Sequence, residues 1–158
     1  MSAVLTFALL LINQPPPKDE APWAGIKEFV TKAAAPDPKD TPLRKLQKER
    51  VRERAVAVSQ IKEVMEIGRW DPSYYASFIK LQDTLWENLA EVVEKPADRV
   101  KCYEMRLGAA KEIERFVTTR VAAGNDPPQM LPIARANLID AEIDLLKVKA
   151  EFEKVGKK

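Results

Sequence analysis

The chain has 158 residues, of which 46% are apolar and 32% are charged, and its formal net charge is +2. This length suits one domain that buries a core without disulfides or metal, and the balanced charge gives no general argument for nucleic acid or acidic lipid as a partner. Histidine is absent and Cys102 is the single cysteine, which excludes histidine-based zinc sites, Ser-His-Asp triads, the Glu-x-x-His di-iron pattern and an internal disulfide.

The first feature along the chain is an apolar run, AVLTFALLLI, at residues 3–12. It is shorter than the roughly 20 residues that span a bilayer, but its length suits the apolar region of a signal peptide. No Lys or Arg precedes it and no clear A-x-A site follows it. We interpret residues 1–12 as a possible signal sequence, which predicts a periplasmic or secreted protein without a transmembrane span. The alternative is a buried N-terminal segment of a cytoplasmic protein.

Residues 13–41 combine proline-rich linkers with one short amphipathic helix, WAGIKEFVTKAAA, expected at residues 23–35. Apolar side chains share one face of this helix at Trp23, Ile26, Phe29 and Val30. Prolines on both sides keep the linkers extended. The helix is therefore expected to dock either on its own domain or on a partner.

Residues 42–155 are predicted to form four long helices, at about 42–67, 71–95, 96–123 and 129–155. Thr41-Pro42 and Asp71-Pro72 have the pattern of an N-cap followed by a proline in the first helical position. Gly68 and Gly124 are expected to end the first and third helices. Short connections require antiparallel neighbours. The prediction is an all-α protein, a bundle of four long antiparallel helices built as two coiled-coil-like hairpins, with a short N-terminal helix.

The fourth helix carries two apolar stripes at heptad spacing. One runs through Leu131, Ala134, Leu138, Ala141, Leu145, Val148 and Phe152. The second runs through Ala136, Ile139, Ile143, Leu146 and Ala150. Steps of three and four residues are typical of helix–helix packing, and alanines let two backbones approach closely. We therefore expect this helix to contact two neighbours.

The run RVAAGNDPPQMLPIARANLIDAEIDLLK, residues 120–147, resembles the hairpin segments of outer-membrane efflux proteins of the TolC type. In that family a helix ends in an R-x-x-x-G-like turn, and a helix patterned L-x-x-A-x-x-x-L-x-x-A follows a short polar stretch. The matching residues are Arg120, Gly124, Leu131, Ala134, Leu138 and Ala141. Residues 54–92 match weakly, and no strand-like alternation for a barrel is present. The resemblance implies a helical hairpin module in the cell envelope and not a channel.

Two clusters of charged residues are candidate binding or catalytic sites. Basic residues crowd the start of the first long helix, at Arg44, Lys45, Lys48, Arg50, Arg52 and Arg54. They suit phosphate binding, but the acidic residues among them favour a solvated face. Asp140 and Asp144 stand four residues apart, which suits a metal ion or acid–base chemistry and equally a solvated face. We predict no catalytic residue, no metal and no cofactor.

These features predict a non-enzymatic structural or protein-interaction bundle associated with the bacterial cell envelope. A protein partner or a second copy is expected to bind through helices, and nucleic acid is not expected. The predicted interaction residues are Trp23, Ile26, Phe29, Leu131, Ala134, Leu138, Ala141 and Leu145. Two alternatives stay open. One is a cytosolic nucleic-acid-binding or regulatory module that uses the basic residues. The other is a small helical enzyme that uses arginine and carboxylates around a bundle cavity, for which a buried Arg–Glu pair facing an apolar pocket is the discriminating observation.

Overall fold

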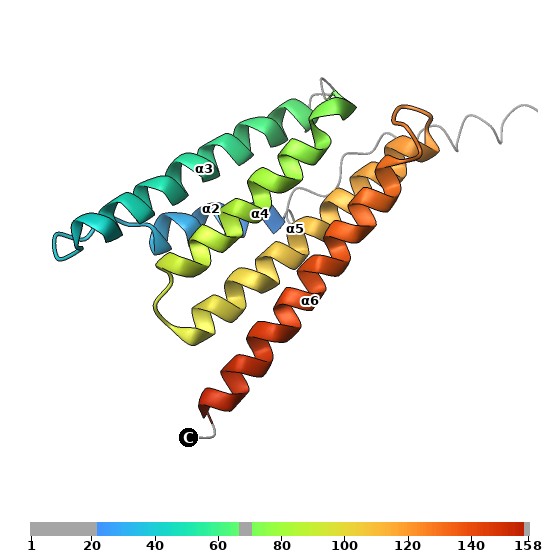
Figure 1. Ribbon diagram of the computed structural model, residues 1–158. Helices are drawn as coiled ribbons and strands as arrows, with labels where there is room; N and C mark the ends of the chain where they lie inside the picture. The colour runs from blue at the N-terminus through green and yellow to red at the C-terminus, as the bar shows by residue number, and fades with distance from the viewer. Residues whose placement is uncertain (1–21, 67–70, 157–158) are drawn as a thin grey trace, which may run out of the picture.

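The computed structural model describes residues 22–66 and 71–156, and these residues form helices and turns without a strand. The α-helices are α2 (Pro22–Ala33), α3 (Pro42–Glu66), α4 (Tyr75–Val92), α5 (Pro96–Ala122) and α6 (Met130–Gly156), and a 3-10 helix, η2 (Pro72–Tyr74), leads into α4. Figure 1 shows how they are arranged. The predicted all-α class is confirmed. The predicted signal sequence, residues 1–12, and Gly68 lie outside the described residues.

The long helices form two antiparallel hairpins. α3 packs along α4, and α5 packs along α6 in the most extensive helix–helix interface of the described chain. α4 contacts α5 and joins the hairpins, while α2 packs against α3 and α5. In Figure 1 α3 and α6 consequently lie at opposite edges of the molecule. The short helix therefore supports the hairpins from one side, and α6 is an edge helix rather than a central one.

Local signals in the sequence set most helix ends. Thr41 Oγ1 accepts a hydrogen bond from the Arg44 backbone N–H at 3.2 Å, and Pro42 opens α3, as an N-cap and an N1 proline should. Gly124 has φ of 73°, and the Asn125 N–H donates to Arg120 O at 2.9 Å. This bond closes the helix end in the way that requires a left-handed residue.

The second long helix begins later than predicted. Asp71 Oδ1 accepts a hydrogen bond from the Ser73 N–H at 2.8 Å, and this turn continues as η2 before α4 starts at Tyr75. An Asp side chain that bonds two residues ahead favours a tight turn over a direct helix start. α4 therefore has 18 residues, whereas α5 and α6 have 27 each. The expected four helices of similar length are thus not what the chain adopts.

The core lies where α2 meets the hairpins. Large side chains from η2–α4 fill it, and Trp86, Tyr75, Phe78, Leu85 and Leu89 are all nearly fully buried. α2 adds Ile26, Phe29 and Val30 from one face, as the amphipathic pattern predicted. Because α2 packs on its own domain through this face, it behaves as part of the fold and not as a free tether.

Candidate interaction surface

α6 has two apolar faces on opposite sides. The inner stripe comprises Leu131, Ala134, Leu138, Ala141, Leu145 and Val148, all of them buried or half-buried. Phe152, the last residue of the stripe as predicted, is 45% exposed and does not belong to it. The outer stripe comprises Ala136, Ile139, Ile143, Leu146 and Ala150, all of them exposed. At about 100° per residue, positions 141 and 143 differ by about 200°, so the stripes lie on opposite sides of the helix. The inner stripe is the one directed at the hairpin partner, α5.

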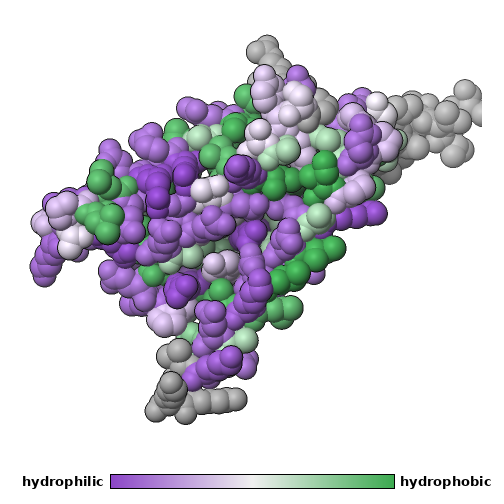
Figure 2. All heavy atoms as spheres, viewed as in Figure 1, coloured by the Kyte–Doolittle hydropathy of each residue, from purple (hydrophilic) through white to green (hydrophobic). Residues whose placement is uncertain are grey.

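The outer stripe exposes large aliphatic side chains to solvent. Ile139 is 55% exposed, Ile143 43% and Leu146 68%. Figure 2 shows apolar residues gathered along the outer edge of the molecule on the side of α6. Scattered exposed apolar residues are ordinary, but a continuous row at heptad spacing marks a surface for another helix. Among the described helices α6 packs mainly on α5 and only slightly on α4. α6 thus has the two neighbours expected from the sequence, but the outer stripe stays exposed beside both of them.

The residues predicted to bind a partner are buried or half-buried within the chain wherever their side chains are described. Ile26 and Phe29 are buried, Ala134 and Ala141 are fully enclosed, Leu145 is buried, and Leu131 and Leu138 are half-buried. The side chain of Trp23 lies outside the described residues. In this chain the seven described residues hold α2 and α6 on their own domain, and their contact with a partner stays a prediction. The sequence signal for the exposed surface is the second apolar stripe of this helix.

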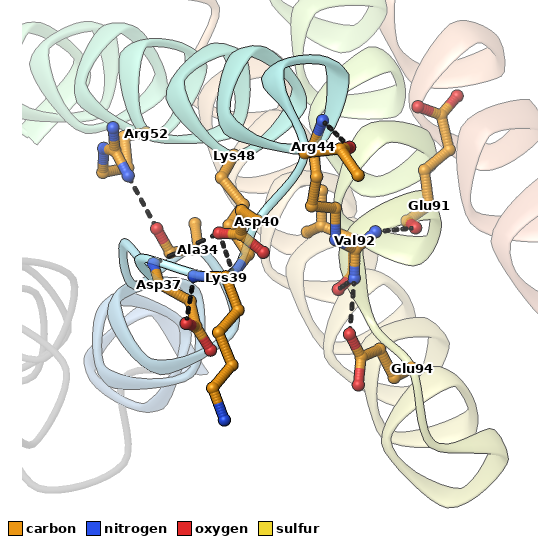
Figure 3. A network of polar contacts seen from close by, with 11 residues as sticks. Ala34, Asp37, Lys39, Asp40, Arg44, Lys48, Arg52, Glu91, Val92 and Glu94 are labelled. Carbon is orange, nitrogen blue, oxygen red and sulfur yellow. Dashed lines mark hydrogen bonds and ion pairs between the residues drawn. The ribbon is translucent and has the colours of Figure 1, made fainter.

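The basic residues of α3 tie the ends of two other helices to α3. The Arg44 guanidinium donates to the carbonyl oxygens of Glu91 and Val92 at the end of α4. The Arg52 guanidinium donates to Ala34 O, just beyond α2, at 2.7 Å. Figure 3 shows both contacts. Unpaired carbonyls carry partial negative charge at a helix C-terminus, so cations stabilise them there.

Three further cations of this cluster also have partners within the chain. Arg50 pairs with Glu91 at 2.7 Å, Lys48 with Asp40 at 2.7 Å, and Arg54 donates to Thr84 O at 3.3 Å. These contacts engage the side chains that phosphate binding would need, so we do not propose nucleic acid as a partner.

A buried arginine joins three helices, which the sequence pattern did not reveal. Arg106 on α5 pairs with Asp83 on α4 at 2.9 Å and with Asp144 on α6. Burial raises the pKa of Asp83 despite Arg106. Burial acts the same way on Asp144, but hydrogen bonds from Arg106 and Lys147 outweigh it and lower the pKa of that carboxyl. With carboxylates on two sides, Arg106 orients α6 on α4 and α5.

The other candidate groups, the Asp140/Asp144 pair and Cys102, lie in surroundings that do not suit chemistry. Asp144 of the Asp140/Asp144 pair is held by Arg106, and no group of three metal-ligating side chains is found within residues 22–66 and 71–156. Cys102 is fully buried, and burial raises the pKa of its thiol to about 12, which keeps the thiol protonated and unreactive. No helix of the described chain is long and apolar enough to cross a membrane.

No protein-family model, no curated protein and no solved structure matches this chain. The surface of the chain therefore indicates its function, and the outer stripe of α6 is the feature that stands out on it.

Proposed function

We propose that this protein is a non-enzymatic helical interaction module of the bacterial cell envelope, in which α6 docks against another helix through its outer stripe. The observation that carries the proposal is the exposed heptad row of Ile139, Ile143 and Leu146 on a helix whose opposite face is already packed. Burying one such side chain contributes about 1.5–3 kcal/mol, so a helix that covers the row gains appreciable free energy.

The rigid mounting of α6 also supports a docking role. The inner stripe and the Asp83–Arg106–Asp144 ion pairs hold this helix against α5 and α4. A pre-ordered helix loses little conformational entropy when a partner binds, which favours association. The envelope part of the proposal is supported by the apolar run at residues 3–12 and by the TolC-like pattern at residues 120–147.

Site-specific photo-crosslinking in cells tests the docking role. A photoreactive residue in place of Leu146, which is 68% exposed, is expected to give a covalent adduct. The same residue in place of Lys111, exposed on α5, is the control and is expected to give none. The added change Ile143→Asp should abolish the adduct because it places a charge in the apolar row. If position 146 yields no adduct with any helix, the outer stripe is not a docking surface and the proposal is wrong.

A further inference from the structure

The geometry points to a second copy of this chain as the occupant of the outer stripe, with the two α6 helices antiparallel about a two-fold axis between Ile143 and Leu146. This inference rests on the proposed function and specifies its partner. It follows from the order of apolar sizes along the stripe and from the charges on its two flanks.

The heptad assignment of the outer stripe places its residues in coiled-coil positions. Ala136, Ile143 and Ala150 take position a, and Ile139 and Leu146 take position d. The flanking positions e and g then hold both signs of charge. Position e comprises Asp140, Lys147 and Lys154, and position g comprises Arg135, Glu142 and Lys149. All of these flanking residues are exposed.

An antiparallel pair centred between positions 143 and 146 sets two large side chains together in each of the two central layers and a large one against a small one in each of the two outer layers. Ile143 of one copy packs against Leu146 of the second copy, and Ile139 packs against Ala150 of the second copy. Two-fold symmetry repeats each contact, so four consecutive layers are apolar. Alternating large and small residues across an interface fills space without voids.

The same register pairs opposite charges on both flanks. In antiparallel coiled coils e lies opposite e and g lies opposite g. Asp140 therefore faces Lys147 of the second copy, and Glu142 faces Lys149 of the second copy, each twice. Within the chain Lys147 pairs with Asp144 at 3.2 Å and Lys149 with Glu104 at 3.0 Å. A lysine ammonium has three donors, so each has donors left for the second copy.

Other arrangements lose this match. A shift of one heptad toward the helix N-terminus places Asp140 opposite Asp140 and Glu142 opposite Glu142. A shift in the other direction places Lys147 opposite Lys147. A parallel pair also sets opposite charges together, Arg135 with Asp140 and Glu142 with Lys147 of the second copy, but it stacks alanine on alanine and sets Lys149 beside Lys154. Exposed ion pairs add at most about 1 kcal/mol each, but like-charge contacts penalise the two shifted registers. The alanine layers and the Lys149–Lys154 contact disfavour the parallel pair.

Sedimentation equilibrium of the purified full chain tests the dimer. We expect a monomer–dimer equilibrium, since a seam of about 12 residues in each copy, positions 139–150, is a small interface. Ile143→Asp should raise the dimer dissociation constant at least about tenfold while far-UV circular dichroism stays unchanged, because Ile143 is exposed in the monomer. Asp140→Lys combined with Glu142→Lys should also weaken the dimer, and added salt should shrink that effect.

Cysteine cross-linking tests the direction and register. Chains with Ile139→Cys mixed with chains with Ala150→Cys should form a disulfide under mild oxidation. Ala150→Cys alone should form none, since in the antiparallel register the two copies of position 150 are about 16 Å apart along the axis, from 11 residues at 1.5 Å each. The parental chain, whose one cysteine is buried, is the control. A disulfide between two copies of position 150 would show a parallel pair and overturn the inference.

The experiments separate failure of the inference from failure of the proposed function. A chain that stays monomeric, with a position-146 adduct to a helix of another protein, overturns the second copy and leaves the docking role intact. An adduct within one chain to residues 1–12 identifies that segment as the occupant and also overturns the inference. A dimer that Ile143→Asp does not weaken uses a different surface, and this result also overturns the inference. A monomer without any adduct at position 146 overturns both.

Discussion

At the residue scale, two alanines determine how closely α6 approaches its neighbours. Ala134 and Ala141 have no exposed surface, and they alternate with Leu138 and Leu145 on the inner stripe. A methyl group is the largest side chain that a tightly packed interface of this kind accepts without adjustment. Their small size, rather than their hydrophobicity, is what the site requires.

Replacing these alanines with leucine is expected to destabilise the fold. Ala134→Leu and Ala141→Leu each add three heavy atoms to a packed interface, and overpacking costs about 1–3 kcal/mol per site. Thermal unfolding of the double variant should therefore give a clearly lower Tm. Ala76→Leu, at an exposed alanine of α4 outside both stripes, is the control and should change the Tm little. A double variant that melts at or above the parent would show that the interface is loose.

Arg106 is expected to be the most sensitive charged residue of the described chain. Arg106→Met leaves Asp83 and Asp144 facing each other without their shared cation. Removing one partner of a buried pair costs about 3–5 kcal/mol, and both carboxylates are 33% exposed, so we expect about 1–3 kcal/mol in urea unfolding.

A triple variant distinguishes two causes of the lost stability: the loss of the ion pairs of Arg106, and the repulsion and burial of the two carboxylates left unpaired. Adding Asp83→Asn and Asp144→Asn to Arg106→Met removes the two unpaired carboxylates. The triple variant should regain a large part of the lost stability. If it is no more stable than Arg106→Met alone, the packing of the arginine side chain, and not its charge, is what matters.

At the element scale, the connection between α2 and α3 is organised by its own side chains. Asp37 Oδ1 accepts from the Lys39 N–H at 2.8 Å, and Asp40 Oδ2 accepts from the Asp37 N–H at 3.2 Å. Lys48 on α3 then pairs with Asp40 (Figure 3). The proline-rich segment that we predicted to be a linker is thus a hydrogen-bonded turn over its described part, residues 34–41.

The Asp40–Lys48 pair predicts a specific pH dependence. The hydrogen bond from Lys48 lowers the pKa of Asp40 below its ordinary value of 3.8. A carboxyl with a lowered folded pKa stabilises the fold fully above its unfolded pKa, and the contribution is lost as pH falls through the folded pKa. Asp40→Asn should therefore lower the unfolding free energy near neutral pH, and its difference from the parent should shrink below about pH 4.

Urea unfolding over a series of pH values measures this difference. Glu49→Gln, an exposed neighbour on α3, controls for the loss of one negative charge. A gap between Asp40→Asn and the parent that stays constant down to the lowest pH would contradict the proposed role of the ion pair.

At the scale of the whole molecule, one edge of the fold carries the exposed outer stripe to which we assign the proposed docking role. α6 is supported on one side by α5 and presents an apolar row on the other (Figures 1 and 2). Residues 1–12 bear on where such an assembly forms, because an exported chain meets its partners in the envelope.

The export hypothesis predicts that the mature protein lacks the apolar N-terminal run. Intact-mass analysis of the native protein should give a mass below the 17.8 kDa of the full chain, and fractionation should place it outside the cytosol. The physical reason is that the apolar run has the length that signal peptidase substrates require. A native protein that retains Met1 and stays in the cytosol would contradict this prediction, and the docking role of α6 would be unaffected.

The sequence by itself determined the elements of this protein and most of their ends. The signals at these ends are Thr41-Pro42, Pro96 and Gly124. They act through backbone angles and hydrogen bonds within a few residues, so the helix ends can be predicted without knowledge of any tertiary contact. The same holds for the buried face of α2, because one helical face needs only local periodicity.

Only the tertiary structure decided which stripe of α6 is covered. Both stripes have heptad spacing, and periodicity cannot distinguish a face that meets α5 from one that meets solvent. Arg44 likewise reaches carbonyls 47 and 48 residues away, and Arg106 bridges residues on two other helices. Such partners depend on how separate helices are placed in space. That placement follows from the packing of the whole chain, and it cannot be predicted from any short stretch of sequence.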